Sequence, residues 1–132
     1  ILSNLSAYPL LIAPFGASTV LLFGAPNSPL AQPRNLIFGN LVGAISAVLC
    51  VFLLGSSSMT CGIAVGLTIV LGQAFRCLHP PAGAVALLGV LLKASPIFIF
   101  IPVLSGSLIL LGIALGFNRF PKREQSYPKH WL

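Results

Sequence analysis

Charged side chains are scarce in this chain of 132 residues. Asp, Glu, Lys and Arg together make up 6% of it, whereas soluble domains average about 25%. Glu124 is the single acidic residue, so general acid–base catalysis by two carboxylates is excluded. An intramembrane carboxylate, the usual partner for a cation or a relayed proton, is also absent.

The few charges are separated by long apolar stretches. No charged residue occurs in 1–33, 35–75, 77–92 or 94–118, and the mean hydropathy is +1.03 with 57% hydrophobic residues. The stretch 35–75 alone has room for two membrane spans of about 20 residues each. A soluble fold of this composition would expose large apolar patches. The sequence therefore predicts an all-α, polytopic membrane protein.

The remaining composition excludes several classes of function. The net charge of +6 does not indicate nucleic-acid binding, because the basic residues lie at the ends of apolar runs. Cys50, Cys61 and Cys77 lack the spacing of a metal site and are predicted to be packing residues. Enzyme signatures such as Gly-x-Ser-x-Gly or a phosphate loop are missing. We predict no catalytic residue, no cofactor and no metal.

Turn formers and apolar runs divide the chain into a transmembrane domain, 1–117, and a basic interfacial tail, 118–132. We expect Pro102 to kink the last span mildly. The five expected membrane elements are 5–25, 36–54, 59–76, 81–93 and 97–117.

The positions of the basic residues predict how the elements cross the membrane. Arg34, Arg76 and the basic tail belong on one side, because positive charges favour the cytoplasmic face. Spans 36–54 and 59–76 form an out-and-back pair, so 77–96 must cross as well for the last span to end on the basic side. The short helices near residues 14 and 81 then enter from opposite faces, as in an inverted repeat.

Two short strings carry the same repeat. Pro14–Ala17 and Pro81–Ala84 both read Pro-x-Gly-Ala, and they are 67 residues apart. The same offset pairs Gly39 with Gly106. Each half would consist of a span, a short helix and a span, so we expect the missing first span upstream of residue 1 or within residues 1–12. Chance recurrence of Pro-x-Gly-Ala is the alternative.

Proline suits the first position of a helix, so each string predicts an abrupt helix start with free backbone N–H groups. We expect those groups at Phe15, Gly16, Ala17 and Ser18, and at Ala82, Gly83 and Ala84. Donors and positive charge without carboxylates favour an anion. The predicted binding residues are Pro14, Phe15, Gly16, Ala17, Ser18, Thr19, His79, Pro80, Pro81, Gly83 and Ala84, with Arg34 and Arg76 attracting the anion at the basic mouth.

Other interpretations of these residues stay open. His79 also fits a residue that only caps a helix, bonds a backbone carbonyl or ligates the metal of a tetrapyrrole. Arg34 and Arg76 also fit ordinary topology-setting charges. Asn40 lies within a span and is predicted to form an interhelical hydrogen bond.

Three strings, Ala13–Ser18, Ser28–Asn35 and Leu78–Ala84, closely resemble the HPP family of integral membrane proteins, which is named for its His-Pro-Pro motif. Asn118-Arg119 and the closing Tyr127-Pro128 with Trp131 are similar to that family's end as well. Members in cyanobacteria and chloroplasts are associated with nitrite transport. The resemblance implies a small-anion transporter in a bacterial inner membrane or a plastid membrane, with nitrite as the first candidate.

The alternative is a structural membrane subunit of a larger complex, whose broken helices only pack. A bundle of five elements encloses little surface, so besides lipids and the anion we expect a second copy or another membrane subunit as partner. We expect no nucleic-acid partner.

Overall fold

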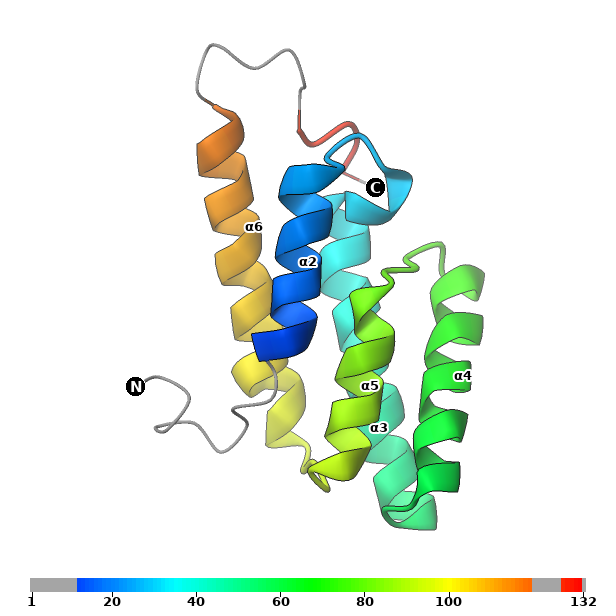
Figure 1. The fold of residues 1–132 in the computed structure, drawn as a ribbon. Helices are drawn as coiled ribbons and strands as arrows, with labels where there is room; N and C mark the ends of the chain where they lie inside the picture. The colour runs from blue at the N-terminus through cyan, green and yellow to red at the C-terminus, as the bar shows by residue number, and fades with distance from the viewer. Residues whose placement is uncertain (1–11, 120–126, 132) are drawn as a thin grey trace.

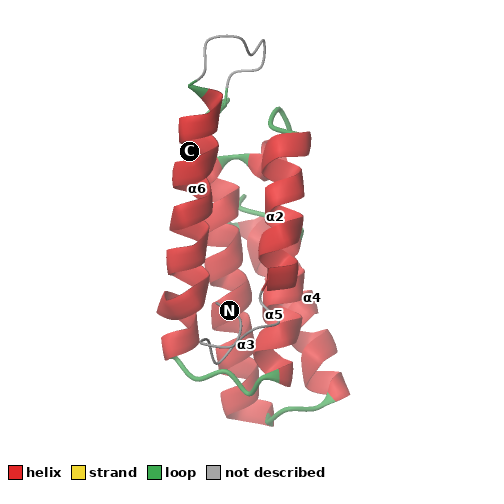
Figure 2. Ribbon diagram, turned by 60° about the vertical axis from the view of Figure 1, so that its left-hand side comes forward, coloured by secondary structure: helices red, strands yellow, loops and turns green. Residues whose placement is uncertain are grey.

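A computed structural model describes residues 12–119 and 127–131. Within these residues the chain is all-helical, with no strand, and the helices lie side by side in an elongated bundle (Figures 1 and 2). This confirms the predicted all-α class. The five α-helices are α2 (Ile12–Gly24), α3 (Asn40–Leu54), α4 (Ser58–Ala74), α5 (Pro81–Leu91) and α6 (Ser105–Asn118).

The two longest helical stretches each begin with a π-helical segment. Asn35–Gly39 (η3) runs into α3, and Ile99–Leu104 (η4) runs into α6. Each resulting stretch has 20 residues and is apolar enough to cross a bilayer. The expected kink at Pro102 is present, and Ile101 before it leaves helical geometry (φ −126°, ψ 114°). Proline disfavours the α conformation in the residue before it.

Helix direction follows the pattern of charges. The α2–α3 and α4–α5 connections and the C-terminal end of α6 lie at one end of the bundle, and the α3–α4 and α5–α6 connections lie at the other (Figure 1). Arg34 and Arg76 belong to connections at the first end, and Lys93 belongs to one at the second. The short helices α2 and α5 consequently run in opposite directions (Figure 1), as an inverted repeat requires.

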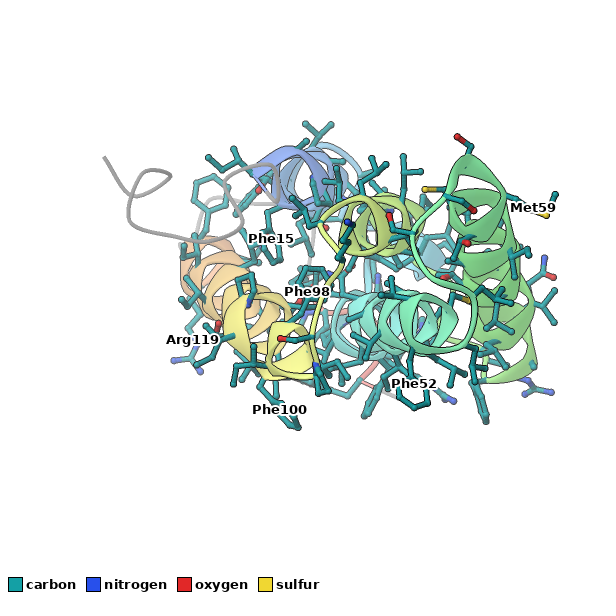
Figure 3. All side chains as sticks on the ribbon, turned by 90° about the horizontal axis from the view of Figure 1, so that it is seen from below. Phe15, Phe52, Met59, Phe98, Phe100 and Arg119 are labelled. Carbon is teal, nitrogen blue, oxygen red and sulfur yellow. The ribbon has the colours of Figure 1, made fainter. Side chains whose placement is uncertain are left out.

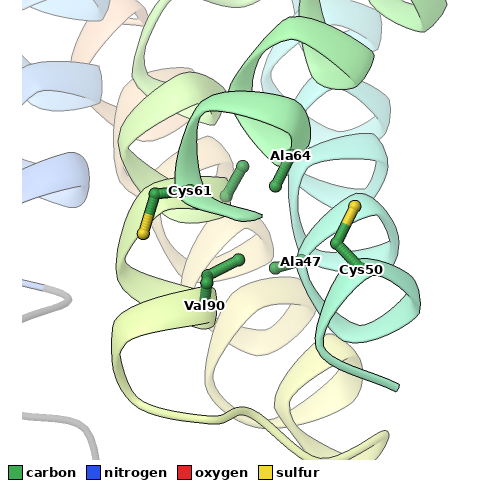
Figure 4. Close-up of a cluster of buried hydrophobic side chains, with 6 residues drawn as sticks. Ala47, Cys50, Cys61, Ala64 and Val90 are labelled. Carbon is green, nitrogen blue, oxygen red and sulfur yellow. The ribbon is translucent and has the colours of Figure 1, made fainter. Parts of the chain in front are cut away.

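Helix α5 is the centre of the bundle and packs against α2, α3 and α4. Small residues allow its backbone to approach α3: a Cβ on Gly43 would lie 2.5 Å from the carbonyl oxygen of Ala82. Apolar side chains from α3, α4 and α5 fill the space below this contact (Figure 4). Cys50 and Cys61 lie in that cluster as buried free thiols, so they are packing residues as predicted.

The outer surface of the bundle is apolar. Phe52 and Met59 point away from the helices, whereas Phe15 and Phe98 point between them (Figure 3). Phe52 is 85% exposed and Met59 is 77% exposed. Large apolar side chains facing outward on most helices suit contact with lipid rather than water.

The described part of the tail is bonded to the bundle. Tyr127 is buried, and its hydroxyl donates to the carbonyl of Ala31 (2.9 Å). The backbone N–H of Lys129 donates to Oε1 of Gln32 (2.7 Å). These bonds fasten the tail to the connection between α2 and α3. The expected segment 5–11 lies outside the described residues.

Candidate functional site

His79 joins three separate parts of the chain. Its Nδ1 lies 3.0 Å from the carbonyl oxygen of Leu30, and its Nε2 lies 2.9 Å from Oγ of Ser18. A carbonyl oxygen only accepts hydrogen bonds, so Nδ1 carries a proton. A charged ring buried here without a bonded counter-charge would be costly, so the ring is neutral and Nε2 accepts from the Ser18 hydroxyl. His79 therefore connects α2, the α2–α3 connection and the start of α5, and it does bond a backbone carbonyl, one of the interpretations left open above.

A glycine brings His79 against the start of α3. A Cβ on Gly39 would lie 2.5 Å from Cβ of His79 and 2.7 Å from the carbonyl oxygen of Cys77. Asn35 adds a hydrogen bond from Nδ2 to the carbonyl of Leu78 (2.7 Å). The loop before α5 is thus held directly on η3.

The residue after Gly39 reaches the opposite helix. Nδ2 of Asn40 donates to Oγ of Ser107 on α6 (3.1 Å). This confirms the predicted interhelical bond of Asn40. Ser107 lies near the middle of the apolar stretch Ile99–Asn118, so this bond belongs to the interior of the bundle.

Helices α2 and α6 also contact each other beside these hydrogen bonds. The ring of Phe15 occupies the space that a Cβ on Gly106 would need, and Phe15 is one helical turn before Ser18 on the same face of α2. Two buried hydrogen-bonded pairs, Ser18 with His79 and Asn40 with Ser107, therefore lie inside the bundle. We call Ser18, Asn40, His79 and Ser107 the central polar cluster; each is at most 1% exposed.

Several of the backbone amides expected to be free at the short-helix N-termini have carbonyl partners. Helix α2 includes Ile12, two residues before the expected start, so the amides from Gly16 onward have carbonyl partners four residues earlier. At α5, the amide of Ala82 donates to the carbonyl of His79 (2.9 Å) and that of Gly83 donates to the carbonyl of Pro80 (3.2 Å). The expectation of free N–H groups at Ala82 and Gly83 is wrong, because a tight turn formed by the His-Pro-Pro segment satisfies them.

The other predicted residues spread over several places. Pro14 is buried in α2, and the Thr19 hydroxyl donates to the carbonyl of Phe15 within the same helix (2.8 Å). A Cβ on Gly16 would meet no atom within 4 Å, and Gly83 faces Val65 of α4. A groove of about 610 Å³ between α2 and α5 is lined by Ala17, Val20, Leu21, Gly24, Ala25, Pro80, Pro81 and Ala84.

Two further cavities flank the segment 75–80. One of about 350 Å³ lies between α4 and α5 and reaches His79, Pro80 and Gly83. The other, of about 520 Å³, is lined by Arg34 and by apolar side chains of α3 and Phe75. Arg34 donates from Nη2 to the carbonyl of Phe75 (2.7 Å). The arginines therefore lie at one end of the bundle and outside the central polar cluster.

An apolar outer surface, two stretches long enough to span a bilayer and a polar interior define an integral membrane protein. A family model described as "HPP, transmembrane region" matches residues 1–128. The chain belongs to this family.

Two curated relatives from Dictyostelium discoideum are named transmembrane proteins. One is 46% identical over 129 aligned residues, which cover 92% of this chain and 45% of the relative. The other is 43% identical over 129 residues, which cover 92% of this chain and 41% of the relative. The chain spans less than half the length of these relatives. No solved structure matches it.

Proposed function

We propose that this protein moves a small monovalent anion across its membrane, with nitrite as the first candidate. The observation that carries the proposal is the central polar cluster, in which one buried bond joins α2 to the loop before α5 and another joins α3 to α6 inside an apolar bundle. An ionisable side chain inside a membrane, such as His79, is costly and marks a functional position by default. The cluster also lies where two short, oppositely directed helices pass each other, as substrate sites of transporters do.

The charges of the chain favour an anion over a cation. Arg34 and Arg76 lie at one end of the bundle and raise the local concentration of anions there. The described residues, 12–119 and 127–131, contain no carboxylate side chain. A cation would therefore meet no opposite charge along this part of the chain.

A structural membrane subunit is the second candidate. Three grooves of the described bundle are lined in part by residues 75–84, yet none of the three reaches Ser18, Asn40 or Ser107. In this alternative the cluster only fastens helices together, and the apolar outer faces contact other subunits or a second copy of the chain. The transport proposal instead requires the helices to separate when the substrate enters.

Nitrite flux into proteoliposomes distinguishes the two candidates. We expect uptake above that of empty vesicles, and we expect His79→Ala to abolish it because the α2 and α5 segments lose their common partner. Ser105→Ala is the matched control, since that hydroxyl bonds only to the carbonyl of Pro102 in its own helical stretch and was not predicted to bind the anion. Uptake equal to that of empty vesicles under every gradient would support the structural subunit. The specific membrane, plastid or bacterial inner membrane, follows from fractionation of cells that express the tagged chain.

A further inference from the structure

We infer that the central polar cluster binds the anion together with one proton, as the undissociated acid, and that the carboxamide of Asn40 recognises that acid. This inference rests on the proposed transport function and names the chemical form of its substrate. The observation behind it is that Oδ1 of Asn40 is buried and has no hydrogen-bond partner, although Nδ2 of the same amide donates to Ser107.

An unpaired carbonyl oxygen in an apolar interior is expensive, so a donor belongs beside it. Asn40 is fully buried and follows directly on Gly39, which touches the loop of His79. A bare anion such as nitrite has only acceptor atoms and cannot satisfy Oδ1. Its conjugate acid has an O–H group and can.

The surroundings of Asn40 are uncharged. Both nitrogens of His79 are engaged in the neutral tautomer, one as a donor to Leu30 and the other as an acceptor from Ser18. Helices α2, α3, α4, α5 and α6, to which Asn40 is bonded, contain no charged residue. The titratable neighbours of His79 are Arg76 and Cys77 in its own loop, with Arg34 bonded to the carbonyl of Phe75 in the same loop. A bare anion at Asn40 would be buried without a counter-charge.

A primary carboxamide is the complement of a small oxyacid. The C=O of Asn40 accepts the O–H of the acid, and the second N–H of Nδ2 donates to another oxygen of the acid. The substrate keeps its proton throughout: anion and proton combine on one side of the membrane and dissociate on the other. No covalent bond of the protein changes, and no net charge crosses.

The opposite orientation of the amide makes the opposite prediction. With O and N exchanged, the Ser107 hydroxyl would donate to Oδ1, and Nδ2 would face the substrate with two donors. That arrangement suits a bare anion, whose transport carries current. The electrical character of the flux therefore tests the inference.

The experiment uses proteoliposomes of the full chain on a solid-supported membrane, with nitrite outside and a pH-sensitive dye inside. We expect nitrite uptake with acidification of the interior, above the level of empty vesicles, and no transport current. Asn40→Leu should lower this uptake at least tenfold. Asn118→Leu is the matched control, because Asn118 also has an unpartnered buried Oδ1 but lies at the end of α6, where Nδ2 bonds only the carbonyl of Ala114.

The outcomes separate the inference from the proposed function. Nitrite uptake that carries current without interior acidification would leave transport standing and overturn the inference, as would undiminished uptake by Asn40→Leu. Absence of any uptake would overturn both. A Leu variant can misfold, so the thermal unfolding midpoint of each variant is measured. As a second measurement, nitrite is added to the protein in detergent. The wild-type chain should take up about one proton per nitrite bound, and folded Asn40→Leu should take up none.

Discussion

Asn40 and Ser107 are joined by a hydrogen bond across the bundle and are separated by 67 residues. The same 67-residue offset relates Pro14 to Pro81, the two prolines of the repeated string. In an internal repeat, equivalent positions touch each other only near the axis that relates the halves. This bond therefore supports a pseudo-twofold axis through the central polar cluster, and the opposite directions of α2 and α5 agree with it (Figure 1).

The first prediction concerns the orientation of the chain in the membrane. Asn27 and Ser95 are both exposed and belong to connections at opposite ends of the bundle. We expect Asn27→Cys and Ser95→Cys to react with a membrane-impermeant maleimide from opposite sides of a sealed vesicle. The native cysteines serve as an internal control, because all three are buried. Labelling of both new cysteines from one side would contradict the inverted arrangement.

A second prediction concerns the bond between Ser18 and His79. Ser18→Ala leaves Nε2 of His79 buried without a partner, which should lower the free energy of unfolding by about 1–3 kcal/mol. Thr19→Val removes a hydroxyl of the neighbouring residue that bonds only within α2 and should change it by less than about 0.5 kcal/mol. A thiol-reactive dye that detects exposure of the buried cysteines on heating measures both. Equal midpoints for the two variants would show that the bond contributes nothing.

Close packing at Gly39 leads to a third prediction. Gly39→Ala places a methyl group against the backbone at Cys77 and the side chain of His79, so we expect destabilisation of about 1–3 kcal/mol from overpacking. Gly62→Ala in α4 meets no atom within 4 Å and should stabilise its helix by up to about 1 kcal/mol. The same thiol assay in detergent compares them, and a Gly39→Ala chain as stable as the wild type would refute the described contact.

The fourth prediction is a dependence on alkaline pH. Burial raises the pKa of Tyr127 from 10.0 to about 12. In the unfolded chain the phenol ionises near pH 10, while in the folded chain it stays protonated until near pH 12. The contribution of Tyr127 to the free energy of unfolding is therefore fully present below pH 10 and is lost between pH 10 and pH 12. Tyr127→Phe should lack this part of the decline, and it should be less stable at neutral pH because the bond to Ala31 is lost. Unfolding midpoints measured between pH 8 and pH 11.5 test both statements. If the midpoints of the wild type and of Tyr127→Phe fall in parallel as the pH rises, Tyr127 does not cause the alkaline decline.

The sequence was sufficient to predict that the chain is helical, in which direction the helices run and that apolar residues face outward. Long charge-free runs require helices, because in lipid each backbone polar group must be satisfied within its own segment. The placement of Arg34 and Arg76 at one end follows from their positions between those runs. The kink at Pro102 was also predicted, because proline disfavours helical geometry in the residue before it.

The sequence predicted only some of the residues of the central polar cluster. Ser18 and His79 were predicted, and Asn40 was predicted as an interhelical partner, but Ser107 carries no local signal that sets it apart from other serines. Its significance lies in its distance from Asn40 along the chain, which matches the repeat. The expectation of free amides at Ala82 and Gly83 was wrong, because the carbonyls of His79 and Pro80 already accept them in a tight turn.

Sequence alone determined that this chain is a helical membrane protein with its basic connections at one end, because hydropathy and charge act through the solvent and need no knowledge of neighbours. Tertiary structure alone decided which polar side chains meet. Ser18, Asn40, His79 and Ser107 come from four distant segments, and hydrogen bonds depend on separations of a few tenths of an ångström. Only the packing of α2, α3, α5 and α6 sets those separations.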